Sequence, residues 1–424
     1  MTPRERLIKT LNHETPDHLC VDMGAGGQTG IGATALHHLN QALFPGYKEK
    51  VKIIEPFQML GGVEEPLLKK LQLDVVGVHG LTTLFGFKNE NWKPFTMPDG
   101  TEVLVPDKFN YKRDANGAYL IYPEGDFSGQ PSAKMPDSGF FFDAITRQEL
   151  IDDEKLDPQD NSEDFGILSE NDLDYYARTT RQLYEETDYG IYVTLPGMAF
   201  GDVALVPATW RKQTKGIRDI QEWVMSLLMR PDYLYQVFEK QCEIAMKNVE
   251  LLAKAIGHHA QVVFVSGTDF GTQNSLFIGL ETYRSLFKPF QKAINDKIHE
   301  LTDWKIFIHS CGAIYDLIPD LIEVGFDVLN PVQVSATGMD AERLKKEFGK
   351  DLVFWGGGVD TQKTLPFGTP DEIYREVRER IDIFSKGGGF VFNPIHNIQS
   401  NVPVENILAM FRAVNDARGF KSDF

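Results

Sequence analysis

The sequence predicts an α/β fold, namely a (β/α)8 TIM barrel with a β-rich insertion between the second and third units. Three observations support this prediction. Eight short β-branched or apolar runs recur along the chain, the later runs are followed by stretches with apolar residues at three- and four-residue spacing, and one segment rich in aromatics, Pro and Gly interrupts the alternation. Alternating strands and helices form a parallel sheet with right-handed crossovers. Eight units favour closure into a barrel, and a doubly wound open sheet is the alternative.

The elements follow in order from local signals. Thr2-Pro3-x-Glu5 predicts the start of a first helix, because a capping hydroxyl is followed by Pro at the first helical position and by a Glu that reaches back. The predicted strands are 18–23, 74–78, 191–195, 262–265, 305–308, 327–329, 352–355 and 390–392. The predicted helices after the fourth strand are 281–301, 313–324, 340–348, 370–384 and 404–418.

Residues 84–143 are interpreted as an inserted antiparallel β excursion near the mouth of the barrel. Asp99-Gly100 and Asn116-Gly117 lie between strand-like runs and predict two-residue hairpin turns. Residues 152–174 are predicted to be an acidic, solvated connector. We therefore expect residues 1–424 to form a single barrel domain that contains this insertion.

Composition and charge restrict the classes of function. The chain has 43 Lys and Arg against 61 Asp and Glu, which gives a formal net charge of −18. This charge repels phosphate backbones, so nucleic acid is not expected as a partner. No charge-free apolar run approaches about 18 residues, so no membrane span is expected. The three cysteines are too few for a disulfide framework, and we expect a cytoplasmic protein.

The carboxyl ends of barrel strands meet at one mouth, where function is expected. The residues that end the predicted strands are dense in metal-ligand and titratable types: His79, Asp269, His309, Cys311, Gln333, Asp360 and His396.

His309-Ser310-Cys311-Gly312 is the sharpest signal among them. Residues two apart on a strand share a face, so His309 and Cys311 can bind one ion. Imidazole and thiolate are zinc ligands, and His396 can supply the third from the end of the last strand. Three protein ligands with one open position are typical of a catalytic zinc site. The alternative is a satisfied core histidine beside a buried cysteine.

Two further features leave alternatives open. Asp269 could be a fourth ligand, orient a ligand histidine, bind substrate, or only cap the following helix. Gly357, within Gly356-Gly357-Gly358, follows the seventh strand, where barrels bring backbone N–H groups to ligands, but a tight turn explains it too.

Several motifs resemble the uroporphyrinogen decarboxylase superfamily along essentially the whole chain. They are the opening 1–6 and 12–17, the segment Asp269-Phe-Gly-Thr-Gln273 with Tyr283-Arg284 and Lys288-Pro289, His309-Ser-Cys-Gly312, and Asn393-Pro-Ile-His396 with 403–406. The resemblance implies a (β/α)8 barrel. It also implies one of two chemistries, tetrapyrrole decarboxylation or zinc-dependent methyl transfer from a corrinoid protein.

The resemblance is stronger to the methyltransferase branch, which includes methylcobamide:coenzyme M methyltransferases. The decarboxylases use an arginine-rich segment after the first strand and an aspartate at the end of the second. This chain has no arginine between Arg6 and Arg113, and His79 occupies the aspartate's position. The methyltransferases bind zinc by a His-x-Cys pair and a later cysteine, which His396 replaces here.

The resemblance therefore implies a zinc-dependent methyltransferase that moves a methyl group from a corrinoid protein to a thiol or tetrahydrofolate. The metal ligands would be His309, Cys311 and His396, the catalytic residues Asp269 and His79, and the substrate-binding residues Gln333, Gly357, Asp360 and Asn393. The alternatives are a decarboxylase-like carboxy-lyase and a non-catalytic corrinoid- or tetrapyrrole-binding barrel. A homodimer is one open option for the assembly.

Overall fold

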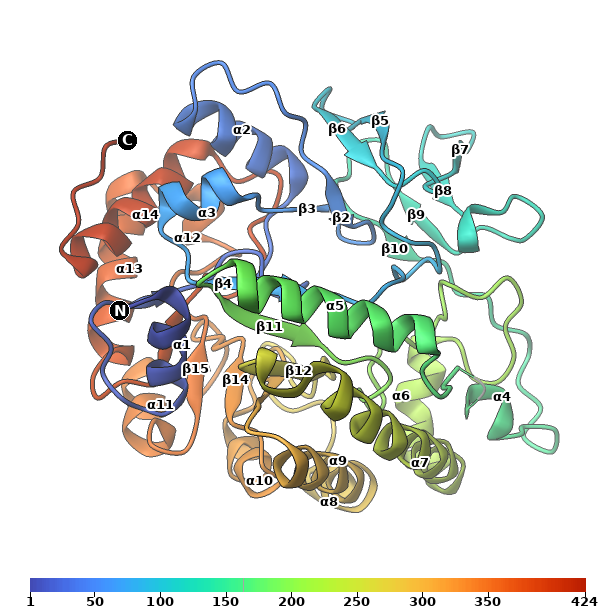
Figure 1. Cartoon of the computed structure of the whole chain (residues 1–424). Coiled ribbons are helices and arrows are strands. Elements are labelled where there is room, and N and C mark those ends of the chain that lie inside the picture. The colour runs from blue at the N-terminus through green and yellow to red at the C-terminus, as the bar shows by residue number, and fades with distance from the viewer. Residues whose placement is uncertain (163) are drawn as a thin grey trace.

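The computed structural model describes residues 1–162 and 164–424, and its centre is a parallel sheet of eight strands (Figure 1). The order is β1-β16-β15-β14-β13-β12-β11-β4. The strands are β1 (Cys20–Val21), β4 (Val75–Val78), β11 (Gly190–Thr194), β12 (Val262–Ser266), β13 (Lys305–His309), β14 (Val328–Asn330), β15 (Val353–Trp355) and β16 (Phe390–Phe392). Each overlaps one of the eight predicted strands, and the predicted α/β barrel architecture is confirmed.

The sheet closes through the seam between its two end strands, β1 and β4. The backbone N–H of Asp74 donates to the carbonyl of Val21 at 2.8 Å, and the Asp74 carboxylate accepts the N–H of Val21 at 2.8 Å. A single side chain therefore extends the ladder where strand pairing is short. The eight strands form a nearly closed barrel as a result.

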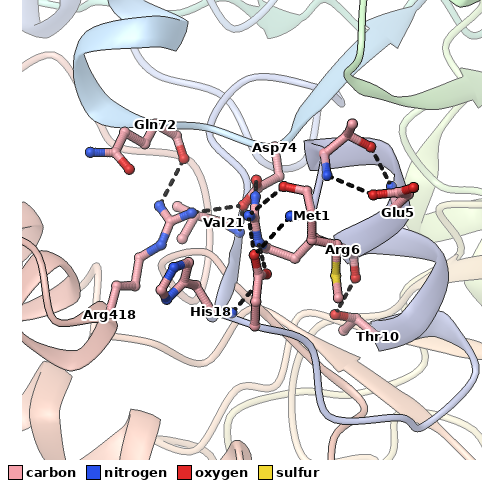
Figure 2. A network of polar contacts seen from close by, with 11 residues as sticks. Met1, Glu5, Arg6, Thr10, His18, Val21, Gln72, Asp74 and Arg418 are labelled. Carbon is pink, nitrogen blue, oxygen red and sulfur yellow. Dashed lines mark hydrogen bonds and ion pairs between the residues drawn. The ribbon is translucent and has the colours of Figure 1, made fainter.

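Asp74 lies at the centre of a buried ionic network (Figure 2). Arg6 donates to Asp74 Oδ1 at 2.5 Å, and Arg418 lies 3.4 Å from Oδ2 while also donating to the carbonyl of Gln72 at 2.8 Å. Arg6 also pairs with Asp17 at 2.8 Å. A buried carboxylate is stable only when it is paired and hydrogen-bonded. The network therefore ties the first and last helices to the seam.

The helices surround the sheet (Figure 1). They are α1 (Pro3–Leu11), α2 (Ala33–Leu43), α3 (Glu65–Leu71), α4 (Gln159–Ser162), α5 (Glu170–Glu186), α6 (Ile220–Met229), α7 (Pro231–Ile256), α8 (Leu280–Leu286), α9 (Lys288–Leu301), α10 (Ile318–Glu323), α11 (Ala341–Phe348), α12 (Thr364–Phe367), α13 (Pro370–Phe384) and α14 (Val404–Arg418). Within the described residues, no helix has the length and apolar character needed to cross a bilayer.

The first helix closes one end of the barrel. Its predicted capping box is present, because the Thr2 hydroxyl accepts the N–H of Glu5 and the Glu5 carboxylate accepts the N–H of Thr2. Leu7 and Leu11 of α1 belong to the same buried cluster as the interior residues of the barrel. Functional residues are consequently confined to the opposite end, where the strands finish.

Aromatic side chains fill the middle of the barrel. The ring centroid of Tyr192 lies 5.2 Å from that of Phe307, and the centroid of Phe307 lies 5.5 Å from that of Trp355. The Trp355 indole donates to Asp22 at 3.0 Å, which satisfies its buried N–H. The barrel is therefore a packed core and not a pore, as is usual for this architecture.

Two predicted helices are interrupted by proline. The prediction 281–301 is divided into α8 and α9 beside Pro289, and 313–324 contains a 3-10 turn, Tyr315–Leu317, before α10 beside Pro319. Proline has no N–H to continue the hydrogen bonds of the preceding turn and is favoured in the first turn of a helix, so a new helix begins at each site. The predictions for α11, α13 and α14 agree with the structure to within one residue.

The insertion follows β4 and lies on the side of the molecule away from both chain ends (Figure 1). Its strands are β5 (Lys93–Thr96), β6 (Glu102–Val105), β7 (Tyr111–Arg113), β8 (Tyr119–Ile121), β9 (Ala133–Met135) and β10 (Asp143–Ala144), and all their pairings are antiparallel. A short hairpin of β2 (Ile53–Glu55) and β3 (Leu60–Gly61) lies beside it.

The two hairpin turns were predicted with the wrong length. The N–H of Gly100 bonds to the carbonyl of Met97, and that of Met97 bonds to the carbonyl of Thr101, so this loop has three residues. Gly117 closes an equivalent loop. Both glycines have positive φ, +90° and +81°, which is the geometry of a turn followed by a left-handed bulge residue.

The predicted solvated connector 152–174 is also corrected. It contains α4 and the first residues of α5, and Asn161 and Ser162 are buried. Asp164 pairs with Arg211 at 2.8 Å and with the buried Arg218. Acidic composition alone could not reveal these buried partners.

Candidate metal centre and cavity

Three predicted metal ligands meet at the mouth of the barrel. His309 ends β13, Cys311 follows two residues later, and His396 follows β16. One ligand atom from each residue lies within 4.8 Å of the others. His309 Nε2 is 3.3 Å from Cys311 Sγ. Strand alternation and the convergence of strand ends thus bring together residues 85 positions apart.

The hydrogen bonds of His309 orient its ring for metal binding. Nδ1 lies 2.6 Å from Asn330 Oδ1, and Asn330 Nδ2 donates to the carbonyl of Trp355 at 2.8 Å. Because the Asn330 amide must donate to that carbonyl, its oxygen accepts from His309 Nδ1–H. The Nε2 lone pair therefore faces Cys311, and a partner of this kind on the distal nitrogen is usual for a metal-bound histidine.

Cys311 is held by the loop that contains Asp269. The Cys311 N–H donates to Asp269 Oδ1 at 2.7 Å. Burial, together with the charge of Asp269, raises the pKa of the Cys311 thiol well above its ordinary value. The thiol is therefore protonated near neutral pH unless a cation stabilises the thiolate.

Gly312 allows these two loops to approach closely. Its φ is +95°, and a Cβ at this position would lie 2.4 Å from the backbone carbon of Gly271. The Gly312 N–H donates to Gln333 Oε1 at 2.7 Å. Glycine is required for both the backbone angle and the contact. Asp269 is 11 residues before the start of α8, whose N-cap is Gly279, so the helix-capping alternative for Asp269 is not observed.

His396 is the member that must change most to bind a metal. Its Nδ1 accepts the N–H of Asn397 at 2.8 Å, so the neutral ring has its proton on Nε2. Burial lowers the pKa of His396 to about 3, and the ring is neutral. Ligation through either nitrogen requires His396 to lose the hydrogen bond with Asn397.

A cavity of about 930 Å³ adjoins this cluster through His309 and His396. His309, His396, Asp269 and His79 line it, so the structure brings both predicted catalytic residues to the predicted metal ligands. Residues of the insertion, including Phe141, Phe142 and Asp143, line it as well. Among the described residues, those lining this cavity include no lysine and no arginine.

The four residues predicted to bind substrate do not line this cavity. Gln333 supports Gly312, and Asp360 accepts the N–H groups of Gln362 and Lys363 at the turn before α12. A Cβ on Gly357 would face Val332. The buried Asn393 amide donates to the carbonyls of Asp22 and Thr29 at 3.1 and 3.3 Å. Each therefore contacts the protein framework, and their role in substrate binding stays a prediction.

Three cavity residues were missed by the sequence reasoning: Glu55, Asp202 and Trp210. Asp202 is eight residues beyond the end of β11, and Glu55 is in the β2–β3 hairpin. The predicted site residues all lie close to the ends of predicted strands. The third predicted strand, 191–195, ends without a titratable residue, so it indicated no candidate. The loop after this strand contains Gly197 and ends in the acidic residue Asp202, and this pattern could have indicated a site residue.

Asp202 gives the fold an unusual dependence on pH. Burial, together with the nearby Asp269, raises the pKa of Asp202 from 3.8 to about 7. The unfolded chain loses this proton near its ordinary pKa, so between these values the folded state binds more protons and its stability falls as pH rises. We compare the free energy of unfolding of wild type with that of Asp202→Asn. The difference, wild type minus variant, should fall by up to about 1.4 kcal/mol for each pH unit as pH rises between 3.8 and about 7. Urea denaturation across this range measures it, and a pH-independent difference would contradict the expectation.

The chemistry of the three residues suits a zinc ion. Two imidazoles and one thiol are within mutual reach, and His309 already presents a lone pair toward Cys311. The donor set is nitrogen and sulfur, which favours zinc over calcium or magnesium. His309, Cys311 and His396 would hold the ion, and a fourth position would be left for another ligand.

The fold and the site together define a (β/α)8 barrel protein with a His/Cys/His cluster beside a cavity at the mouth of the barrel. Residues 144–417 match the uroporphyrinogen decarboxylase (URO-D) family model. The chain belongs to the uroporphyrinogen decarboxylase family. No protein with a curated description matches the chain significantly.

One solved structure supports the fold. A methyltransferase from Methanosarcina mazei is similar with a TM-score of 0.53 and 15% identity, over 98% of this chain and 99% of that chain. A xylose isomerase-like TIM barrel protein from Mycobacterium smegmatis has a TM-score of 0.29 and 12% identity, over 59% of this chain and 80% of that chain. The first likeness extends over the whole chain, including the insertion, and the second adds nothing to the fold assignment.

Proposed function

We propose that this protein is a zinc-dependent methyltransferase that moves a methyl group from a corrinoid protein to a thiol or tetrahydrofolate acceptor. The observation that supports it most directly is the 3.3 Å approach of His309 Nε2 to Cys311 Sγ, with His396 within 4.8 Å, at the wall of a large cavity. A bound zinc ion would supply Lewis acidity, which lowers the pKa of an acceptor thiol.

The protein's own residues have separable roles in this proposal. Asn330 fixes the ring of His309, and Asp269 fixes the backbone of Cys311. The pKa of Asp202, about 7, suits a group that accepts the acceptor's proton near neutral pH. The sulfur–methyl bond forms as the donor's cobalt–carbon bond breaks, and the electron pair of that bond stays with the cobalt.

The lack of cationic side chains in the cavity disfavours the decarboxylase alternative. A tetrapyrrole with several carboxylates needs arginine or lysine partners, because buried unpaired charges are costly. None of the described residues lining the cavity is of either type. Methyl transfer is therefore the activity that the site supports best.

The proposal is tested by incubating the purified protein with methylcobalamin and a panel of thiols and tetrahydrofolate. We expect loss of methylcobalamin absorbance and a methylated product identified by mass spectrometry. Chelation of the metal should lower the rate at least about a hundredfold, since Lewis-acid stabilisation is worth several kcal/mol, and added zinc should restore it. Equal rates with and without metal, or turnover of uroporphyrinogen to coproporphyrinogen, would contradict the proposal.

A further inference from the structure

The carboxylates of the cavity fall into two groups. Asp164 and Glu124 are neutralised by basic residues outside the cavity, since Asp164 pairs with Arg211 and Arg218, and Glu124 pairs with Lys212 at 2.9 Å. Glu55, Asp143, Asp202 and Asp269 have no such partner within the part of the chain that the structure describes, and of these Asp143 is exposed. The second group therefore has no counter-charge from the protein inside the cavity.

Backbone N–H groups donate to the three carboxylates that are not exposed, Glu55, Asp202 and Asp269. Glu55 accepts from Phe57 and Gln58, at 3.2 and 2.7 Å, and Asp202 accepts from Ala204 at 2.9 Å. Burial raises the pKa values of both Glu55 and Asp202. Backbone donors fix the position of a carboxylate, but they do not supply the counter-charge that its burial requires.

Two other features of the cavity indicate a ligand. Aromatic side chains line it, among them Phe57, Phe141, Trp210 and Phe264, and aromatic faces attract organic cations. His79 also lines it, and this imidazole makes no hydrogen bond with any residue that the structure describes. Burial lowers the pKa of His79 to about 4, so the ring is neutral and adds no positive charge.

We propose that the cavity binds a substrate that carries an alkylammonium group, which Glu55 and Asp202 recognise together with the aromatic lining. This inference rests on the proposed function and specifies its substrate class. The group belongs to an aminothiol acceptor, because the proposed function takes its methyl group from a corrinoid protein and delivers it to a thiol. The cavity volume is within the range of small-molecule sites.

The charge balance persists when the metal site is filled. A divalent ion with the Cys311 thiolate would contribute one net positive charge, whereas Glu55 and Asp202 contribute up to two negative charges when they are ionised. An anionic acceptor would therefore enter a cavity of its own sign. The structure thus favours cationic over anionic thiols at the acceptor position.

Isothermal titration calorimetry on the full chain tests the inference by binding alone, so its result does not depend on methyl transfer. The first comparison uses choline and its neutral carbon isostere, in which carbon replaces the ammonium nitrogen. The second uses two thiols of opposite charge, cysteamine and mercaptoethanesulfonate. We expect each cation to bind at least about tenfold more tightly than its comparison compound. One additional contact between opposite charges is enough to produce a difference of this size.

Tighter binding of cysteamine than of choline supports an aminothiol acceptor, and the reverse order overturns that assignment. Glu55→Gln and Asp202→Asn should each weaken binding of the cation at least about tenfold. Asp126→Asn is the matched control, because it removes the same charge from a residue that pairs with Lys212 outside the cavity. Equal binding of choline and its isostere, or tighter binding of mercaptoethanesulfonate than cysteamine, overturns the inference. Neither comparison requires a variant to fold.

If cations bind as expected but no methyl transfer is found with any acceptor, the proposed function fails while the substrate class stands. If methyl transfer to an anionic thiol is found and cations do not bind, the proposed function stands while this inference fails. The two results are therefore distinguishable.

Discussion

Replacement of Cys311 by serine is expected to lower the zinc content from about one ion per chain to below about a tenth of that value, because the thiolate is the only anionic ligand among the three. A serine hydroxyl keeps the size of the side chain but is far less easily ionised. Methyl transfer should be lost with the metal. Elemental analysis of protein purified without added metal measures the content, and circular dichroism checks the fold.

Cys242→Ser is the matched control for this change. Cys242 is a buried cysteine on α7, packed in the layer outside the sheet, so its replacement should leave the metal content unchanged. Equal zinc in Cys311→Ser and wild type would remove Cys311 from the site. If Cys242→Ser also loses zinc, the metal content depends on the stability of the fold and not on Cys311 as a ligand.

Asp74→Ala is expected to lower the free energy of unfolding by about 3–5 kcal/mol, since it leaves the buried guanidinium of Arg418 without a carboxylate and leaves Arg6 with Asp17 alone. Arg6 and Arg418 both contact Asp74, and the carboxylate also accepts the N–H of Val21 at the seam between β1 and β4 (Figure 2). The urea concentration at the midpoint of unfolding, with its slope, measures the change.

Glu14→Ala provides the comparison, because the pair of Glu14 with Lys9 is exposed and such pairs contribute about 0–1 kcal/mol. The network lies at the opposite end of the barrel from the cavity, so the folded Asp74→Ala variant should retain its zinc. A shift no larger than that of Glu14→Ala would show that the network does not stabilise the closure of the barrel.

The strands were predictable because each is a short apolar run between turn residues, and fully buried parallel strands have this pattern. The cluster of His309, Cys311 and His396 was predictable for a related reason: these residues lie at or just beyond the ends of strands, and strand ends converge. The breaks at Pro289 and Pro319 and the three-residue hairpins follow from local backbone chemistry that the periodicity of apolar residues does not report.

The cavity carboxylates were less accessible to sequence reasoning. Glu55 and Asp202 are on connections whose path depends on packing. The number of residues between each of them and the nearest strand end therefore does not predict that their side chains line the cavity. The partners of Asp164 were hidden for the same reason, because Arg211 and Arg218 are 47 and 54 residues away in sequence.

The sequence by itself determined the alternation of strands and helices, the place of the insertion and the spacing of His309 and Cys311. These features depend on local periodicity and on side-chain alternation. Only the tertiary structure decided that Asp74 joins the ends of the sheet and that Asn330 orients His309. It also decided which carboxylates of the cavity lack a cation. The physical reason is that pairing and desolvation depend on neighbours in space, and these neighbours come from distant parts of the chain.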